Sequence, residues 1–463
     1  MTSEKQLLEQ LRRVMGEGRV LSDPDKLEEV CWDALGDSRI HPRKRPPVEL
    51  PLCALLPRST AEVREAVLLA NREKVPIVPF GGGSGLMGGA LSIRRGIVLD
   101  LRQMDRITAI DKRSFTATAQ AGVVLEDLEK ALNRQGLILG HDPWTLPVAT
   151  VGGAISTNSL GYRGARYGSM GDQVLGLEVV LPMGEILRTR AVPKSSTGIS
   201  LKHLFIGAEG CLGVITEATV RVFPAPEKRA LFGFSFSSFE QGYGAIEKIF
   251  ARGIVPAVVD FGDDTVKFEG RAVLYLGFEG VGEVVDAESK IAVGICREAG
   301  AVELPRADAE YFWNDRHVIA RQFKSSRRRR RERSGDFIKR DWIHVALPAS
   351  EVLAFRRAAM KIVPEHDIRL QESGLWNRPE LFSMRLAVED SGDGQGQERL
   401  QETVEELLRL VQKMGGSMEY THGVGIKLAS LMAEEHGYGL EVMRRIKRSL
   451  DPNNIMNPGK LGL

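Results

Sequence analysis

Cysteine is scarce in this chain and is not arranged as a metal-binding motif. The four cysteines are far apart and none forms a CxxC pair: Cys31, Cys53, Cys211 and Cys296. A zinc site or an iron–sulfur cluster is therefore not indicated. A disulfide framework is not indicated either, because the chain is long and poor in cysteine.

Long hydrophobic runs and a surplus of one charge are also absent. No stretch reaches the ~18 consecutive apolar residues needed to cross a bilayer, and residues 1–13 lack the apolar core of a signal peptide. Lysine plus arginine (63) nearly balances aspartate plus glutamate (61), which gives no argument for nucleic-acid binding. We therefore expect a cytoplasmic protein without a nucleic-acid partner.

The chain does have the length and the patterns of a multidomain α/β or α+β protein. Its 463 residues indicate at least two hydrophobic cores. A first helix is predicted after Ser3, and a second after Ser59, where Glu62 has the spacing of a capping box. Buried strands are predicted at residues 53–56, 75–80 and 96–101.

The composition changes after Pro224 and Pro226, where longer strands begin to alternate with helices. Strands are predicted at 231–236, 255–261 and 271–278. We expect three parts: residues 1–224, residues 225–415, and a C-terminal segment, residues 416–463.

A glycine-rich segment, residues 79–89, follows the second predicted strand. Glycines permit positive φ and leave N–H groups unshielded, so successive amides can converge on an anion such as a pyrophosphate. A Rossmann site would need a helix directly after the loop. Only residues 90–95 separate this loop from the next strand, so the sequence predicts a strand–loop–strand cradle instead.

Two further segments combine glycines with small polar side chains. Residues 150–161 contain Ser, Thr and Asn side chains that can hydrogen-bond phosphate oxygens or the polar edge of a flavin. Residues 207–215 lead into a strand-like run ending at Val222. We interpret both as loops followed by apolar strands.

Together these motifs resemble those of the FAD-linked oxidases of the vanillyl-alcohol-oxidase superfamily, over nearly the whole chain. The matching stretches are PFGGGSGLMGG, TVGGAISTN, RYGSMGDQVLGLEVVLPMGE, FIGAEGCLGVITEATV, HGVGIKLA and DPNNIMNPGKL. The chain looks similar to D-lactate, glycolate and D-2-hydroxyglutarate dehydrogenases and to alkyl-dihydroxyacetonephosphate synthase. The resemblance implies an α+β fold: a two-subdomain FAD-binding domain of the PCMH type, a mixed antiparallel α/β cap domain, and a C-terminal segment that returns to the flavin.

The resemblance also implies which residues bind the cofactor. The pyrophosphate would be held by Pro79, Phe80, Gly81, Gly82, Gly83, Ser84 and Gly85. The rest of the FAD would be contacted by Trp144, Thr145, Leu146, Pro147, Val148, Ala149, Thr150, Gly152, Gly153, Ser156, Thr157, Asn158, Ser159, Glu209, Gly210, Gly213, Val214 and Ile215. The first loop contains no histidine that could carry a covalent flavin, so we expect FAD to be bound non-covalently.

Two residues are candidates for the chemistry on the substrate. His422 lies in a glycine turn, and its unperturbed pKa near neutrality suits a base; a buried structural histidine is the alternative. Arg316 matches the position where hydroxy-acid relatives keep an arginine for the substrate carboxylate, a task suited to a guanidinium fork; a surface arginine on a helix is its alternative.

The departures from the family pattern limit the assignment. Several relatives have an HxGDGNxxH metal motif with a glutamate before the catalytic histidine. Here residues 372–377 replace the motif and Thr421 replaces the glutamate, so we predict no bound metal. The preferred function is FAD-dependent dehydrogenation of a small 2-hydroxy acid such as D-lactate or glycolate by hydride transfer to flavin N5. The alternatives are a flavin-adduct transferase like alkyl-dihydroxyacetonephosphate synthase and a flavin subunit of a larger complex.

A run of arginines, Arg327 to Arg331, is the one conspicuous charge cluster. It is interpreted either as a solvated loop or as a peripheral contact with anionic lipid, where each basic residue contributes on the order of 1 kcal/mol. A quinone or an electron-transfer protein as acceptor, and a homodimer, are further hypotheses.

Overall fold

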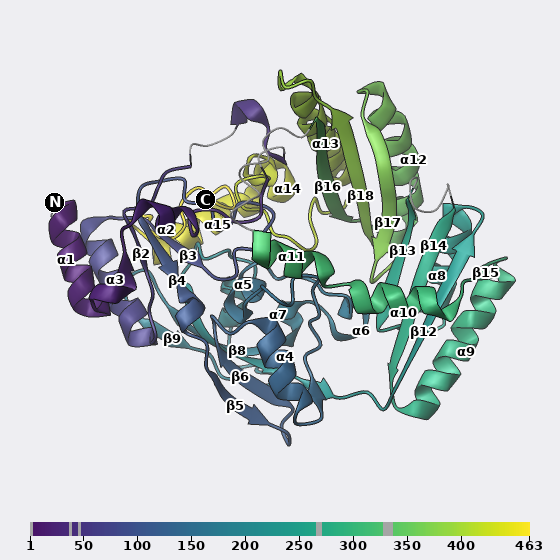
Figure 1. Ribbon diagram of the computed structural model, residues 1–463, viewed down its shortest axis with the longest axis horizontal. Coiled ribbons are helices and arrows are strands. Elements are labelled where there is room, and N and C mark those ends of the chain that lie inside the picture. The colour runs from purple at the N-terminus through teal and green to yellow at the C-terminus, as the bar shows by residue number, and fades with distance from the viewer. Residues whose placement is uncertain (1–2, 37–38, 45–47, 265–270, 327–336) are drawn as a thin grey trace.

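The computed structural model describes residues 3–36, 39–44, 48–264, 271–326 and 337–463. Four sheets organise the chain (Figure 1). The first has the order β1 (Val20–Leu21), β2 (Cys53–Leu55), β4 (Ile97–Asp100) and β3 (Ile77–Phe80). Strands β2, β4 and β3 are parallel, and no helix stands between β3 and β4 among these described residues. The strand–loop–strand prediction is therefore confirmed.

The second sheet has five antiparallel strands and completes the N-terminal half. Its order is β5 (Ile107–Asp111), β6 (Thr116–Gln120), β10 (Val214–Arg221), β8 (Val174–Val180) and β9 (Ile186–Arg188). A two-stranded sheet pairs β7 (Leu137–Ile138) with β11 (Phe223–Pro224). The helices of this half are α1 (Glu4–Met15), α2 (Pro24–Glu28), α3 (Thr60–Glu73), α4 (Leu125–Asn133), α5 (Val151–Ser156), α6 (Gly164–Tyr167) and α7 (Met170–Gln173).

Two helix caps show how local sequence sets these elements. Ser3 caps α1 with a reciprocal capping box to Gln6, and Leu7, Leu11 and Met15 face the core. Ser59 caps α3 by accepting the N–H of Glu62. The Glu62 carboxylate does not return to Ser59 as the sequence suggested. It pairs instead with Arg19, at 2.6 Å, and accepts the backbone N–H of Arg58 at 2.7 Å.

The second half is built on one seven-stranded antiparallel sheet. Its order is β15 (Val302–Glu303), β12 (Lys228–Phe236), β14 (Ala272–Gly280), β13 (Val258–Asp264), β17 (Arg369–Trp376), β18 (Leu381–Glu389) and β16 (Ile338–Ala346). The helices are α8 (Phe239–Ala251), α9 (Gly282–Glu298), α10 (Arg306–Asp315), α11 (Val318–Ser326), α12 (Ala349–Glu365) and α13 (Gln395–Lys413). Helices α8, α9, α12 and α13 pack on this sheet and share one apolar core with it.

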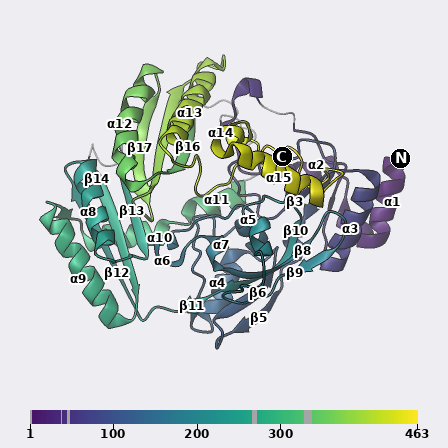
Figure 2. The same ribbon diagram turned by 180° about the vertical axis from the view of Figure 1, so that it is seen from behind.

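The C-terminal segment joins the two halves. Its helices α14 (Met432–His436) and α15 (Tyr438–Leu450) lie between the N-terminal sheets and the seven-stranded sheet in both views (Figures 1 and 2). Beyond α15 the chain reaches β3, where Ile77 N–H donates to Ile455 O at 2.7 Å. Before α14, Ile426 N–H donates to Met87 O at 3.0 Å in the first glycine loop. The expected return of this segment to the FAD-binding half is thus present.

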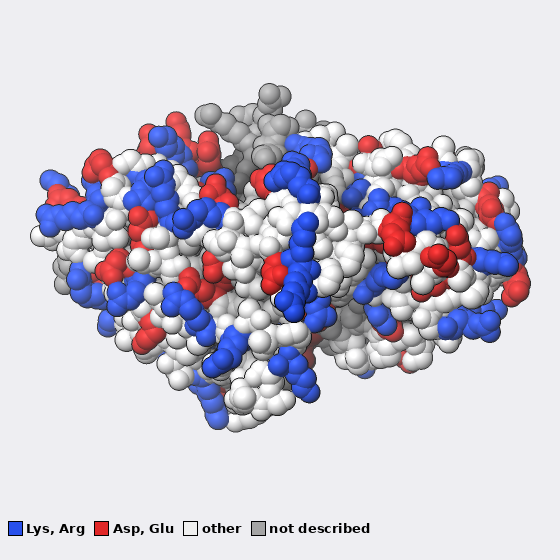
Figure 3. Space-filling model, turned by 90° about the horizontal axis from the view of Figure 1, so that it is seen from below, with Lys and Arg blue, Asp and Glu red and all other residues white. Residues whose placement is uncertain are grey.

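The apolar content of the helices and the distribution of surface charge bear on which binding partners the protein could have. No helix among the described residues is long and apolar enough to span a membrane. On the face seen from below, acidic and basic side chains are interspersed (Figure 3). Residues 327–331, the arginine run, lie outside the described residues.

Candidate active site

The first glycine loop, residues 81–89, passes so close to a second backbone segment that side chains are excluded. A Cβ on Gly81 would lie 2.4 Å from Thr150 Oγ1, and a Cβ on Gly82 would lie 2.2 Å from Val148 O. Gly83 has φ of +60°, which favours glycine. The two segments thus bring backbone groups close together, an arrangement that fits a pyrophosphate.

The second glycine segment is helical, and here the sequence interpretation was wrong. Residues 151–156 form α5, with Thr150 as its N-cap accepting Gly153 N–H at 3.3 Å. Two more short helices, α6 and α7, follow before the next strand, β8. The Thr150 cap and the bend at Asn158, with φ of +48°, explain why this glycine-rich segment is helical and not extended.

The third segment, residues 207–215, carries the buried carboxylate of Glu209, which lies close to the first glycine loop and to the turn after His422. Glu209 accepts the N–H groups of Val424 (2.6 Å) and Gly425 (2.9 Å), two and three residues after His422. A Cβ on Gly89 would lie 3.1 Å from the same carboxylate. Burial raises the pKa of Glu209 to about 7, although the two backbone N–H donors oppose this.

All three segments open onto one cavity of about 360 Å³, within the range of small-molecule sites. Most predicted residues line it: Pro79, Phe80, Gly81, Gly82, Gly83, Ser84, Gly85, Trp144, Thr145, Ala149, Thr150, Gly152, Gly153, Ser156, Thr157, Ser159, Glu209, Gly210, Gly213, Ile215 and His422. Leu146, Pro147, Val148, Asn158, Val214 and Arg316 are not among the lining residues. The backbone cradle and the small polar side chains fit the phosphates and the polar ring edge of FAD.

His422 lies at the cap end of this cavity against two other titratable groups. Its ring packs edge-on against His344 of β16, with centroids 4.4 Å apart. Glu419 accepts the backbone N–H groups of Thr421 and His422 at 2.8 and 2.9 Å, and its Oε1 lies 3.6 Å from His422 Nδ1. Burial lowers the pKa of His344 to about 3, so this ring stays neutral. Burial opposes ionisation of Glu419, but the neighbouring His422 outweighs it and lowers the pKa of Glu419.

The same three side chains could also bind a metal ion. The ligand atoms of His344, Glu419 and His422 lie within 4.8 Å of one another. His344 of this set comes from β16, outside residues 372–377, which replace the family motif. Among the described residues one other such group exists, the exposed trio His41, Glu398 and Glu402. Our expectation of no metal remains a prediction.

The cap sheet contributes polar residues that the sequence did not single out. Asp260, Glu372, Ser383 and Arg385 of this sheet line the cavity with Trp342, His344 and Trp376, and Tyr162 and Tyr420 join them from outside the sheet. Ser383 Oγ lies 2.9 Å from Tyr420 Oη. The sequence signal was the alternation of polar and apolar residues in residues 338–346 and 258–264, but alternation alone does not reveal which strands are neighbours.

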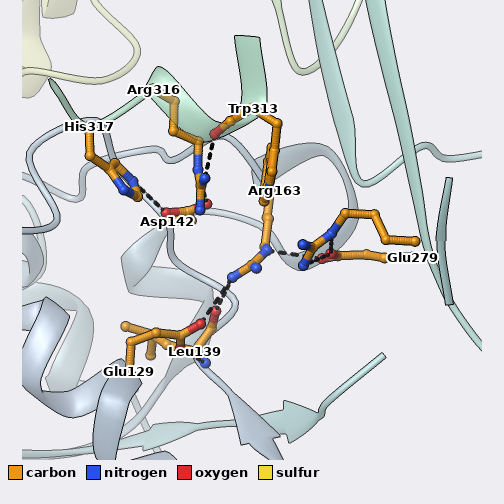
Figure 4. A network of polar contacts seen from close by, with 9 residues as sticks. Glu129, Leu139, Asp142, Arg163, Glu279, Trp313, Arg316 and His317 are labelled. Carbon is orange, nitrogen blue, oxygen red and sulfur yellow. Dashed lines mark hydrogen bonds and ion pairs between the residues drawn. The ribbon is translucent and has the colours of Figure 1, made fainter. Parts of the chain in front are cut away.

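Arg316 is held by a buried carboxylate outside the cavity (Figure 4). Its Nε donates to Asp142 at 3.0 Å and its Nη1 donates to the Trp313 carbonyl at 2.5 Å, while the guanidinium lies 3.7 Å from the centroid of the Trp313 ring. His317 Nε2 lies 2.9 Å from the same carboxylate. Asp142 is buried, yet His317, Arg163 and Arg316 lower its pKa below the usual range. These contacts occupy Arg316 and give little support to its predicted role at the substrate carboxylate.

Comparison with known proteins agrees with this architecture. Residues 51–190 match the FAD binding domain model, and residues 225–461 match the model of the C-terminal domain of FAD linked oxidases. A glycolate oxidase subunit of Bacillus subtilis is 30% identical over 426 residues, which cover 89% of each chain. A D-lactate dehydrogenase of Anaerostipes hadrus is 30% identical over 428 residues, covering 87% of this chain and 88% of that one.

Solved structures show the same fold at lower identity. A crystal structure of alkyldihydroxyacetonephosphate synthase superposes with a TM-score of 0.80 at 23% identity, covering 99% of this chain and 86% of that one. p-Cresol methylhydroxylase superposes with a TM-score of 0.79 at 20% identity, covering 100% and 98% of the two chains. Because both family models match and a relative that is 30% identical covers most of the chain, the chain belongs to the FAD-linked oxidases, and FAD is its cofactor.

Proposed function

We propose that the protein oxidises a small 2-hydroxy acid to the 2-oxo acid. One observation carries the proposal: His422, backed by Glu419, faces the same cavity as the FAD cradle. FAD supplies the acceptor for the C2 hydride, at its N5. His422 takes the hydroxyl proton as the C2–H bond breaks, so the substrate loses one hydride and one proton.

The neighbours of His422 prepare it for this task. The buried Glu419 carboxylate holds the backbone on both sides of Thr421, and its Oε1 lies 3.6 Å from Nδ1 of the His422 ring. The hydroxyl of Tyr420, whose pKa is raised by burial, stays protonated and can donate to a substrate oxygen. Arg385 replaces Arg316 in this account as the cation nearest the substrate, because it lines the cavity.

The binding mode of FAD and the identity of the electron acceptor are proposals that fewer observations support. The described histidines that line the cavity are His344 and His422, both at the cap end, and no described cysteine lines it, which supports non-covalent FAD. A quinone or protein acceptor, lipid contact through residues 327–331 and a homodimer are proposals that rest on the sequence alone. The division of the chain into residues 1–224, 225–415 and 416–463 is likewise a proposal that rests on the sequence alone.

The test is an anaerobic absorbance titration of the purified holoprotein with D- and L-2-hydroxy acids. We expect the flavin band to bleach with at least one acid and without added metal. The panel should run from glycolate and lactate to 2-hydroxyglutarate and longer hydroxylated acids. A flavin band that stays unbleached across the whole panel contradicts the proposal and favours the adduct-transferase or subunit alternatives.

A further inference from the structure

A buried histidine, His141, stands behind the wall of the FAD cavity. Its side chain is 1% exposed, and its Nε2 lies 3.0 Å from Oγ of Ser159. Ser159 lines the cavity, and His141 is not among the lining residues. The other ring nitrogen, Nδ1, is buried and has no hydrogen-bond partner among the described residues. The Ser159 hydroxyl is therefore the polar contact through which this ring reaches the cavity.

The backbone around this pair leaves the two side chains little freedom. The N–H of Tyr162 donates to the carbonyl of Asp142 at 2.8 Å. A Cβ on Gly161, two residues after the serine, would lie 2.6 Å from Asp142 N. A Cβ on Gly140, directly before the histidine, would lie 2.7 Å from Tyr167 Cβ. The two segments are therefore packed closely enough to fix the histidine ring, as a residue that orients a neighbour requires.

Burial decides the charge of the His141 ring. It lowers the pKa of His141 to about 4, although the neighbouring carboxylate of Asp142 opposes this. The ring is therefore neutral at pH 7 and has a single N–H. A proton on Nδ1 would be a buried donor without an acceptor among the described residues, whereas a proton on Nε2 reaches the oxygen of Ser159. The proton is therefore assigned to Nε2, and His141 donates to Ser159.

Ser159 keeps its own proton when its oxygen accepts from His141. Its Oγ lies 3.3 Å from the carbonyl oxygen of Ala154, which is long for a hydroxyl hydrogen bond. An acceptor on a ligand in the cavity can therefore replace this carbonyl. Because hydrogen bonds in a chain polarise one another, donation by His141 makes the Ser159 hydroxyl a stronger donor. With the opposite tautomer, the hydroxyl proton would be bound to His141, and Ser159 could only accept from a ligand.

Ser159 lies at the end of the cavity where the candidate base stands. The next residue, Leu160, donates its N–H to Oγ1 of Thr421 at 3.4 Å, and Thr421 directly precedes His422. Ser159, Thr421 and His422 all line the cavity. The redox chemistry of FAD takes place on its flavin ring, so the proposed role of His422 requires the ring at this end. The polar edge of that ring offers acceptors to the Ser159 hydroxyl.

We propose that His141 is a positioning residue that acts through Ser159: it donates to the Ser159 hydroxyl, and this hydroxyl donates to the polar edge of the flavin ring and favours the reduced flavin. Reduction brings negative charge onto the ring. A donor at its edge stabilises that charge more than it stabilises the neutral oxidised ring. The inference goes beyond the proposed function, on which only the placing of the ring beside His422 rests.

The experiment measures the midpoint potential of the flavin in the holoenzyme, by anaerobic titration with dithionite against a reference dye. No hydroxy acid is needed, so the result does not depend on the substrate. Ser159→Ala should make the potential more negative, because the reduced flavin loses a charge-assisted hydrogen bond. We expect the ratio of the affinities for reduced and oxidised FAD to fall about tenfold, which corresponds to about 30 mV for a two-electron couple.

Two variants of His141 separate its role from that of a merely structural residue. His141→Asn should also make the potential more negative, because the short amide does not reach Ser159. His141→Gln should keep the wild-type potential, because its longer side chain can place an amide N–H where Nε2 stands. In the Ser159→Ala protein, His141→Asn should cause no further shift. His203→Asn is the matched control, since His203 is exposed and does not line the cavity, and it should leave the potential unchanged.

The sign of the shift decides the inference. An unchanged or less negative potential in Ser159→Ala overturns it, because Ser159 then does not donate to the reduced ring. A further shift when His141→Asn is added to Ser159→Ala overturns the action of His141 through Ser159. Ser159→Ala decides the first point even where a histidine variant does not fold. If the potentials shift as expected and no hydroxy acid bleaches the flavin, the proposed function fails while this inference stands.

Discussion

Gly82→Ala tests the FAD cradle most sharply, because its added methyl group meets backbone alone. The new Cβ would lie 2.2 Å from Val148 O, 3.0 Å from Val148 C and 3.1 Å from Ala149 Cα. Carbon contacts need about 3.5 Å and backbone atoms cannot rotate away, so the two segments must separate by about 1 Å. Such overpacking costs about 1–3 kcal/mol. We therefore expect FAD to bind about 5- to 150-fold more weakly.

The assay is reconstitution of apoprotein with FAD, followed by the quenching of flavin fluorescence. Gly244→Ala is the matched control, since a Cβ there has nothing within 4 Å and the residue lies inside α8. This control should bind FAD like the wild type and be slightly more stable. If Gly82→Ala binds FAD with the wild-type Kd, the loops at 81–82 and 148–150 do not form the cradle.

Three further predictions concern single buried or catalytic groups. His422→Gln should slow flavin reduction about 10²- to 10⁴-fold while FAD content stays at the wild-type level; an unchanged rate removes His422 as the base. The pKa of Glu209 is about 7 in the folded protein, against a usual value of 4.5. Its contribution to the free energy of unfolding is therefore complete below about pH 4.5 and is lost as the pH rises through 7. The loss amounts to up to about 3 kcal/mol. Glu209→Gln should remove this component, which thermal unfolding midpoints of the holoprotein from pH 5 to 8 would reveal. Asp142→Asn should destabilise the fold by about 3 kcal/mol, because Arg316 and His317 lose their buried partner. A raised KM with unchanged stability would instead support the role of Arg316 at the substrate carboxylate.

Local patterns predicted the parts of the fold that depend on neighbouring residues. The Ser3 cap and apolar spacing predicted α1, and the short spacing between residue 89 and residue 96 excluded a Rossmann helix. The glycine stretches marked the cavity wall because tight backbone approach leaves few other residue types possible. The helix after Thr150 was missed, because a threonine cap outweighed the loop preference of Gly152 and Gly153.

Contacts between distant residues could not be predicted in this way. Arg385 faces the cavity because β18 lies between β17 and β16, and the strand order is not written in any single segment. Arg316 is held by Asp142, 174 positions away. Its position in the family pattern predicted a role at the substrate carboxylate, and its contact with Asp142 does not support that role. His344 reaches His422 only because β16 closes the sheet beside the C-terminal segment.

The central claim is hydride transfer from C2 of a hydroxy acid within this cavity, and substrate deuterated at C2 tests it most directly. The measurement is the rate of anaerobic single-turnover flavin bleaching with the preferred acid, protiated against deuterated, since single turnover isolates the chemical step. The account predicts clearly slower bleaching with the deuterated acid in the wild-type holoenzyme. Bleaching at the same rate with both acids would show that the C2–H bond does not break in the step that reduces the flavin, and would contradict the account.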